Sequence, residues 1–138
     1  MTRAYLALGT NLGDKPLNLE RAIALIAERV GAVSAISSLY ESEPWGFDSD
    51  NSFLNMAIAV DTALEPEKLL SATQQIEKEM GRTRKSGSSH AYQDRIIDID
   101  IILYGDITYK SDNLEIPHPL YKQRPFVMIP LQEILSLD

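Results

Sequence analysis

Hydrophobic residues recur along this chain with two periods, one typical of helices and one typical of strands. Apolar residues spaced by three and four positions from Leu19 to Val30 predict a helix that ends before Gly31. The same spacing predicts a second helix that Pro66 opens and Gly81 ends. Both helices therefore have one apolar face to bury, and a sheet is the natural partner for it.

Short apolar runs around these helices predict β-strands at Tyr5–Leu8, Val33–Tyr40, Phe53–Val60 and Ile96–Tyr104. A last apolar run, from Val127 toward Leu135, is compatible with a helix. The order of strand, helix, strand, strand, helix and strand predicts an α+β fold. Its core would be a ferredoxin-like βαββαβ unit, an antiparallel sheet with helices on one face. Residues 1–138 contain no long-period repeat or internal boundary, so we expect a single domain.

The composition narrows the class of protein. Hydrophobic residues make up 44% and charged residues 24%, which excludes disorder as a description of the whole chain. The chain has no cysteine, which excludes disulfides, thiolate nucleophiles and cysteine metal sites. The first apolar run is too short for a secretory signal, and no run reaches the length of a membrane span. We therefore expect a cytoplasmic protein that does not engage membranes.

The charge of the chain is unevenly distributed. The formal net charge of −7 argues against broad binding to nucleic acid or anionic membranes, and by itself disfavours a phosphate substrate. Residues 41–79 hold nine acidic and two basic residues, whereas residues 82–95 hold four basic residues and one acidic residue. This second segment has no hydrophobic period, and a loop of its length in a compact domain is usually functional or disordered. A globally acidic chain can thus present a local cationic loop to phosphates.

Two carboxylates interrupt the most hydrophobic of the predicted strands. Asp98 and Asp100 are two residues apart, so both point to the same face of the sheet, about 7 Å apart along the strand. The opposite face of the strand would carry Ile97, Ile99, Ile101 and Leu103. Paired carboxylates suit Mg²⁺, which commonly takes one or two protein carboxylates and completes its shell with water and phosphate oxygens. The alternative is that this face is solvated and the pair only aids solubility.

The cationic loop lies directly before this acidic strand, and it supplies Arg82, Arg84, Lys85 and Arg95. A charge run alone is usually a solvated loop. Basic side chains next to a candidate metal site, however, are what phosphoryl transfer requires, because that chemistry depends on positioning and charge neutralisation. The pairing of loop and strand therefore favours an enzyme acting on a phosphate ester or anhydride.

A second candidate group lies near the C-terminus. His118 stands between Pro117 and Pro119, which restrict the local backbone and can hold the imidazole in place. Arg124 and Phe126 follow closely and add a cation and an aromatic ring. A lone histidine is more often structural or simply exposed, so both interpretations of His118 remain open.

Aromatic residues and one amide indicate a planar ligand. Asn55 interrupts an apolar strand, and a buried amide must find hydrogen-bond partners in the protein or in a ligand. Trp45, Phe53 and Phe126 could supply flat walls for a heteroaromatic substrate, although Phe53 could equally be a core residue.

In combination these segments resemble the 6-hydroxymethyl-7,8-dihydropterin pyrophosphokinase family of folate biosynthesis. The matching segments follow in order through nearly the whole chain: Gly9–Gly13, Phe53–Asn55, Gly81–Lys85, Arg95–Ile101, Pro117–Pro119 and Arg124–Val127. Tyr92, Gln93 and Asp94 differ from the family's usual Trp-Gly-Pro, and Asp94 adds a negative charge. A non-catalytic relative that binds pterin or nucleotide is therefore an alternative, and a ferredoxin-like interaction module is another.

The resemblance implies an ATP-dependent diphosphokinase that transfers the diphosphoryl group of ATP to the hydroxymethyl group of the dihydropterin and releases AMP. It implies that Asp98 and Asp100 bind a pair of Mg²⁺ ions. It also implies that ATP and the hydroxymethyl dihydropterin are the partners, and we take a monomer as the default state. By the same likeness Arg82 and Arg95 would neutralise phosphate charge, and the other implied ATP contacts are Arg84, Lys85, Ile101, His118 and Arg124. The implied pterin contacts are Ser42, Glu43, Trp45, Phe53, Asn55 and Phe126.

Overall fold

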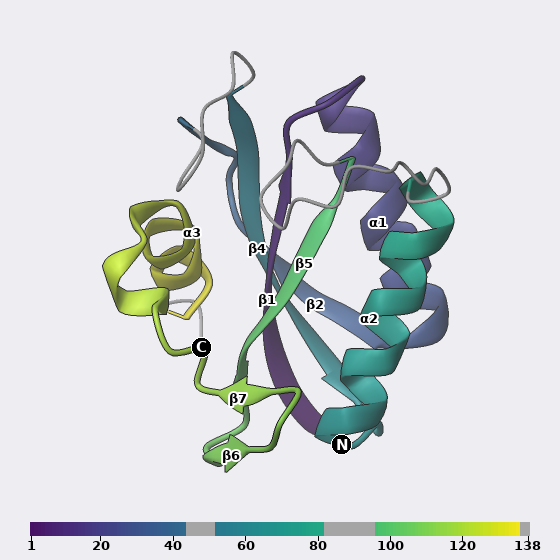
Figure 1. Cartoon of the computed structure of the whole chain (residues 1–138), viewed down its shortest axis with the longest axis vertical. Helices are drawn as coiled ribbons and strands as arrows, with labels where there is room; N and C mark the ends of the chain where they lie inside the picture. The colour runs from purple at the N-terminus through teal and green to yellow at the C-terminus, as the bar shows by residue number, and fades with distance from the viewer. Residues whose placement is uncertain (44–51, 82–95, 136–138) are drawn as a thin grey trace.

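The computed structural model describes residues 1–43, 52–81 and 96–135 (Figure 1). Among the predicted site residues, Trp45 and the basic residues of segment 82–95 lie outside these ranges. In chain order the elements are β1 (Thr2–Thr10), α1 (Lys15–Arg29), β2 (Gly31–Ile36), β3 (Tyr40–Ser42), β4 (Phe53–Thr62), α2 (Pro66–Gly81), β5 (Asp98–Tyr104), β6 (Tyr109–Lys110), β7 (Glu115–Ile116), η1 (Tyr121–Gln123) and α3 (Pro125–Leu135).

The principal sheet is antiparallel, with strand order β2-β4-β1-β5, and short β3 pairs with β4 beyond the end of β2. Helices α1 and α2 lie together against one face of this sheet, as Figure 1 shows. The predicted α+β fold with a ferredoxin-like βαββαβ order is thereby confirmed. Helix α2 has the bounds that Pro66 and Gly81 predict, because proline suits a first helical turn and glycine a last one.

The third helix lies on the other side of the sheet. Figure 1 shows α3 opposite α1 and α2. Its apolar residues Val127, Leu131 and Ile134 pack with Ala57 and Ala59 of β4. The face that the sequence left uncovered is therefore covered in part by the C-terminal helix.

One strand prediction is wrong. The sequence predicts a single strand over Val33–Tyr40, whereas the structure has β2 and β3 with a break between them. The break begins at Ser37, whose hydroxyl accepts a hydrogen bond from the Ala57 N–H at 2.9 Å and donates one to the Ser38 carbonyl at 2.8 Å. A side chain thus takes the place of a backbone acceptor in the ladder, and the chain leaves its register.

A β-bulge changes the phase of β5. Tyr5 pairs with Leu103 and Leu6 pairs with Ile101, so Ile102 is an extra residue in the strand. Ile99 and Ile101 lie in the core beneath α1 and α2 as expected, but Leu103 packs on the α3 side with Ile102, contrary to the sequence prediction. An inserted residue reverses the alternation of all side chains beyond it.

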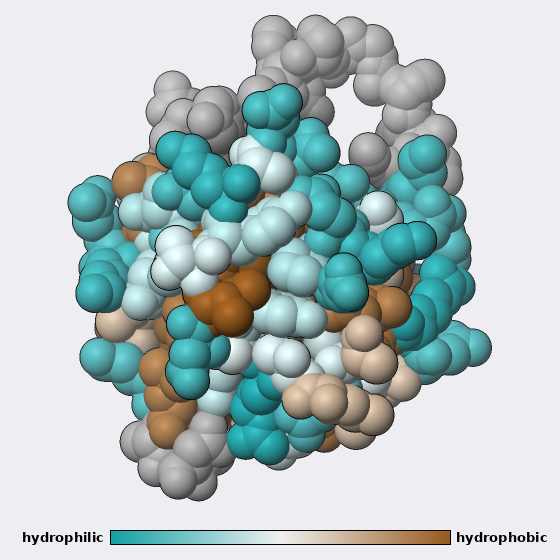
Figure 2. All heavy atoms as spheres, turned by 90° about the horizontal axis from the view of Figure 1, so that it is seen from below, coloured by the Kyte–Doolittle hydropathy of each residue, from teal (hydrophilic) through white to brown (hydrophobic). Residues whose placement is uncertain are grey.

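Polar side chains cover most of the face seen in Figure 2, with small apolar areas between them. Among the described residues, no helix is both long enough and apolar enough to cross a membrane. Scattered exposed apolar side chains such as Ile107 are normal for a folded domain.

Candidate active site

Residues of three neighbouring strands lie in rows on the α3 side of the sheet. Gly9 of β1 pairs with Asn55 of β4 on one side and with Asp98 of β5 on the other. Directly paired residues of an antiparallel sheet share a face, so Asn55 and Asp98 point to the same side, roughly 10 Å apart across two strand spacings. In the next row on this face, Ala7 pairs with Ala57 and Asp100.

Small residues in the central strand β1, Ala7 and Gly9, project little or nothing above the backbone on this face. Gly9 lies between the two polar side chains, and a Cβ placed on it would come within 3.1 Å of Asn55 Oδ1 and 3.5 Å of the Phe53 ring. Asn55 and Phe53 therefore lie over the backbone of Gly9. The space that a larger residue would occupy is filled by the amide and the ring of the neighbouring strand.

Asn55 is buried, and its amide group is held by β3. Its Nδ2 donates hydrogen bonds of 2.9 Å to the Tyr40 carbonyl and of 2.9 Å to the Ser42 hydroxyl. These bonds fix the amide orientation and direct its carbonyl oxygen toward Gly9. Of the other predicted pterin contacts, Ser42 ends β3, and Glu43 follows it as an exposed residue.

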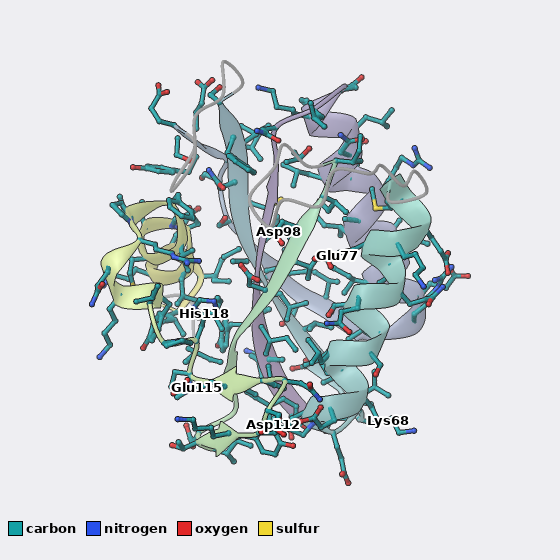
Figure 3. The ribbon with its side chains drawn as sticks, in the orientation of Figure 1. Lys68, Glu77, Asp98, Asp112, Glu115 and His118 are labelled. Carbon is teal, nitrogen blue, oxygen red and sulfur yellow. The ribbon has the colours of Figure 1, made fainter. Side chains whose placement is uncertain are left out.

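Asp98 and Asp100 lie at the start of β5, and both are half-buried. Figure 3 shows Asp98 at the upper end of this strand, across from α2. The described residues contain no group of three or more histidine or acidic side chains close enough together to hold a metal ion. A two-carboxylate donor set nevertheless fits Mg²⁺, which binds through one or two carboxylates when substrate phosphates complete its shell.

His118 is anchored against β5 at the other end of the strand. Its N–H donates to the Ile102 carbonyl at 3.1 Å, and its ring Nδ1 accepts a hydrogen bond from the Leu120 N–H at 3.3 Å. A neutral ring that accepts at Nδ1 carries its proton on Nε2, so Nε2 is the atom able to donate to a ligand.

His118 interacts electrostatically with other residues of the candidate site. Burial lowers the pKa of the imidazole below its usual value, and the nearby Arg124 guanidinium lowers it further. The carboxylates of Asp98 and Glu115 act in the opposite direction. At neutral pH the ring is therefore uncharged. The charges of Asp98, a candidate metal ligand, and Arg124, a candidate phosphate ligand, both act on it.

Arg124 directly precedes α3, and Phe126 in its first turn packs against the apolar cluster between α3 and the sheet. The Arg124 guanidinium carbon lies 6.0 Å from the centre of the Phe126 ring, the range of a cation–π contact. The Arg124 carbonyl accepts the first hydrogen bonds of α3, from the Val127 and Met128 N–H groups. The position of this helix therefore determines where both side chains lie.

Ile101 differs from the other predicted ATP contacts. Its side chain is buried in the core beneath α1 and α2 and does not share the face of Asp98. Because β5 is the last strand of the sheet, the residue can reach a ligand only through its backbone at the strand edge.

Two glutamates of α2 make contacts that the sequence did not predict: Glu77 bonds β5, and Glu67, ten residues earlier in the helix, bonds the β6–β7 hairpin. Glu77 accepts a 2.7 Å hydrogen bond from the Ile99 N–H at the outer edge of β5, and Figure 3 shows it beside that strand. Glu67 accepts hydrogen bonds from Tyr109 and Ser111. Helical spacing places Glu77 next to core-facing Ile76, at the border of the apolar face, but this signal does not identify its partner.

The two described residues that flank segment 82–95 in the sequence lie together. A Cβ placed on Gly81 would come within 2.7 Å of the Ile96 side chain, so the last residue of α2 touches the first described residue before β5. The predicted residues Arg82, Arg84, Lys85 and Arg95 belong to the segment between them and lie outside the described residues.

The antiparallel sheet carries Asn55 on β4 and two carboxylates, Asp98 and Asp100, on β5, and its α+β fold is shared with solved structures. The structure superimposes on the Plasmodium falciparum protein solved as "HPPK-DHPS wild type with SDX-DHP" with a TM-score of 0.76 at 19% identity. The match covers 97% of this chain and 40% of that one. At this identity the likeness establishes the fold, and this chain corresponds to less than half of the solved chain.

Sequence comparison makes the assignment specific. The model of the 7,8-dihydro-6-hydroxymethylpterin-pyrophosphokinase family matches residues 5–136. The 2-amino-4-hydroxy-6-hydroxymethyldihydropteridine pyrophosphokinase of Porphyromonas gingivalis is 45% identical over 135 residues, 97% of this chain and 91% of the relative. The protein of the same name from Bacillus subtilis is 42% identical over 132 residues, 95% of this chain and 77% of the relative. The chain belongs to this pyrophosphokinase family, and as a member it is a diphosphokinase of folate biosynthesis.

Proposed function

We propose that this chain transfers the diphosphoryl group of ATP to the hydroxymethyl group of 6-hydroxymethyl-7,8-dihydropterin, with the pterin bound near Asn55 and the triphosphate bound near Asp98 and Asp100. The observation that carries the proposal is the row Asn55–Gly9–Asp98, which puts an amide and a carboxylate on one face of the sheet. A planar ligand at one end of the row would have its substituent directed toward the carboxylates at the other.

The pterin would lie between Phe53 and Phe126, with Asn55 reading its edge. The buried amide is already fixed by β3, so recognition would cost little side-chain entropy. Ser42, Glu43 and Trp45 would complete this end of the site as further pterin contacts. A heteroaromatic ring with donor and acceptor edges suits an amide between aromatic walls.

Asp98 and Asp100 would hold Mg²⁺. When bound, the metal supplies Lewis-acid neutralisation of the triphosphate charge. The two carboxylates would otherwise repel each other and a phosphate ligand, so their half-buried position on one face supports a cation-binding role.

His118 and Arg124 would bind phosphate oxygens. The uncharged imidazole donates from Nε2, and the guanidinium supplies a permanent positive charge. The adenine would lie along the outer edge of β5 near Ile101, where a strand edge offers backbone donors and acceptors.

Arg82 and Arg95 would neutralise the charge that develops on the transferring group, with Arg84 and Lys85 assisting. The contact between Gly81 and Ile96 supports this, because each neighbours one of these arginines in the sequence. In the reaction, the hydroxymethyl oxygen would attack the β-phosphorus, and its proton would pass to water. The bond from the β-phosphorus to the oxygen bridging the α-phosphorus would break, and AMP would leave with that oxygen.

The test is to incubate the protein with ATP, Mg²⁺ and the hydroxymethyl dihydropterin and to identify the products. We expect AMP and the pterin diphosphate, formed only when both substrates are present. Formation of ADP would contradict the proposal. Pterin binding without turnover would identify a non-catalytic relative instead.

A further inference from the structure

The carboxylate of Glu67 bonds helix α2 to the β6–β7 hairpin. Glu67, in the first turn of α2, accepts hydrogen bonds of 2.7 Å from the Tyr109 hydroxyl and 2.6 Å from the Ser111 hydroxyl. A third side chain of the hairpin, Asn113, also hydrogen-bonds to Glu67. Hydrogen bonds to a charged acceptor are stronger than bonds between neutral groups. These hydrogen bonds, called the Glu67 tether below, therefore hold the hairpin to α2 in a defined geometry.

The hairpin has little secondary structure of its own, so contacts outside it determine its position: Tyr109, Leu114 and Ile116 pack against the main core, and Glu67 bonds the Tyr109 and Ser111 hydroxyls. Strands β6 and β7 are two residues each, paired as Tyr109 with Ile116 and Lys110 with Glu115. An isolated two-stranded hairpin is marginally stable in water. Its turn is closed by one backbone bond, from the Ser111 N–H to the Leu114 carbonyl at 2.8 Å. Glu67 thus fixes the tip, while buried Ile116 fixes the base.

The position of the hairpin influences where His118 lies along the outer edge of β5. Two residues after Ile116, the His118 N–H is bonded to the Ile102 carbonyl. On the same strand, the Ile99 N–H is bonded to Glu77 of α2. Figure 3 shows Glu77 beside the upper part of β5 and His118 beside its lower part, with Lys68 of α2 and Asp112 of the hairpin at the lower end. Ile101 lies between these two attachments.

We propose that Glu67 is a positioning residue for the nucleotide half of the site: by holding the β6–β7 hairpin to α2, it sets the place of His118 relative to the edge of β5. The inference rests on the proposed function, because it assigns this edge to ATP. Glu67 itself does not touch the substrate. Loss of the tether should weaken nucleotide binding and leave the pterin end, which is built on β3 and β4, unchanged.

The variant Glu67→Gln tests this, with Glu65→Gln as its matched control. Both changes remove one negative charge near the start of α2, but Glu65 is exposed and outside the tether. The readouts are calorimetric affinities for a non-hydrolysable ATP analogue with Mg²⁺ and for the hydroxymethyl dihydropterin, together with the KM for ATP and kcat. In Glu67→Gln we expect about tenfold weaker nucleotide binding, a similar rise in the KM for ATP, and unchanged pterin affinity and kcat. Glu65→Gln should match the wild type in all four.

Tyr109→Phe and Ser111→Ala provide milder tests, since each removes one hydroxyl donor and leaves the carboxylate in place. Each should weaken nucleotide binding by a smaller factor, and neither should add its full factor in the Glu67→Gln background. An unchanged nucleotide affinity in Glu67→Gln, or equal losses for nucleotide and pterin in these hydroxyl variants, would overturn the inference. Either result leaves the proposed function standing, because that is judged separately by AMP formation in the wild type.

Discussion

The two faces of the sheet differ in what the same strands present to them. Toward α1 and α2, β1 and β4 present large side chains, among them Leu6, Leu8, Met56 and Ile58, all at most 5% exposed. Toward α3 the alternate positions of these strands carry the small or polar residues Ala7, Gly9, Asn55, Ala57 and Ala59, with the aromatic side chains of Tyr5 at one end and Phe53 at the other. One face is built for burial of apolar area, whereas the other carries polar side chains at the end where Asn55, Asp98 and Asp100 lie. Under the proposed function, stability and ligand binding would therefore depend on alternate residues of the same strands.

The largest effect is expected from a comparison of two neighbouring residues of β5 that lie on opposite faces of the sheet, Asp100 and Ile99. Asp100→Asn removes a proposed metal ligand on the α3 side, and we expect turnover to fall by about a thousandfold, since a metal supplies several kcal/mol of charge stabilisation. The free energy of unfolding should be unchanged or slightly higher, because repulsion with Asp98 is relieved. Steady-state AMP formation and urea unfolding measure the two quantities.

Ile99→Ala is the control from the opposite face. Ile99 is 5% exposed in the core beneath α1 and α2, so its truncation should lower the free energy of unfolding by about 2–5 kcal/mol. The folded protein should keep most of its turnover. Near-normal turnover in Asp100→Asn, or loss of turnover in Ile99→Ala without loss of stability, would contradict the division.

A smaller effect is expected from adding one methyl group at Gly9, beside Asn55. Gly9 does not have a positive φ, so Gly9→Ala introduces no backbone strain. The new Cβ would lie 3.1 Å from Asn55 Oδ1 and would push the amide aside. Loss of one aligned hydrogen bond, about 1 kcal/mol, should weaken pterin binding by about fivefold.

Pterin titration of a double variant shows whether the methyl group acts through Asn55. Gly9→Ala should cause no further loss of affinity in an Asn55→Ala background, because the displaced amide is then absent. Additive losses would mean that Gly9 contributes to binding independently of Asn55.

The smallest effect concerns the pH dependence of stability. Burial lowers the pKa of His118 below its ordinary value of 6.5, so the unfolded chain binds a proton more readily than the folded protein does. The free energy of unfolding should therefore decrease as pH falls below about 6.5, until the lowered pKa of the folded state is reached. Urea unfolding between pH 5 and pH 7.5 should show a shallower slope in His118→Gln than in the wild type. Equal slopes would mean that the imidazole is not held in its uncharged form.

Much of the fold could be predicted from local pattern. The limits of α2 agree with its proline and glycine, and the order of strands and helices along the chain contains the predicted βαββαβ pattern. The common face of Asp98 and Asp100 follows from the two-residue period of any strand. In the site, the sequence could identify Asn55 as an unusual residue, because an amide within an apolar strand demands partners.

The tertiary structure decided the features that depend on residues far apart in the chain. Ser37 ends β2 through a bond to Ala57, twenty residues away, and the bulge at Ile102 exists only because β5 must pair with β1. Glu67 meets Ser111 across 44 positions, and no local period encodes that encounter. Within an uninterrupted strand or helix, periodicity fixes which side a residue occupies, since it follows from backbone geometry, but the bulge at Ile102 reverses the side of Leu103. The partner on that side is determined only when tertiary packing brings distant parts of the chain together. The common face of Asp98 and Asp100 was therefore predictable, whereas the contacts of Ser37 and Glu67 were not.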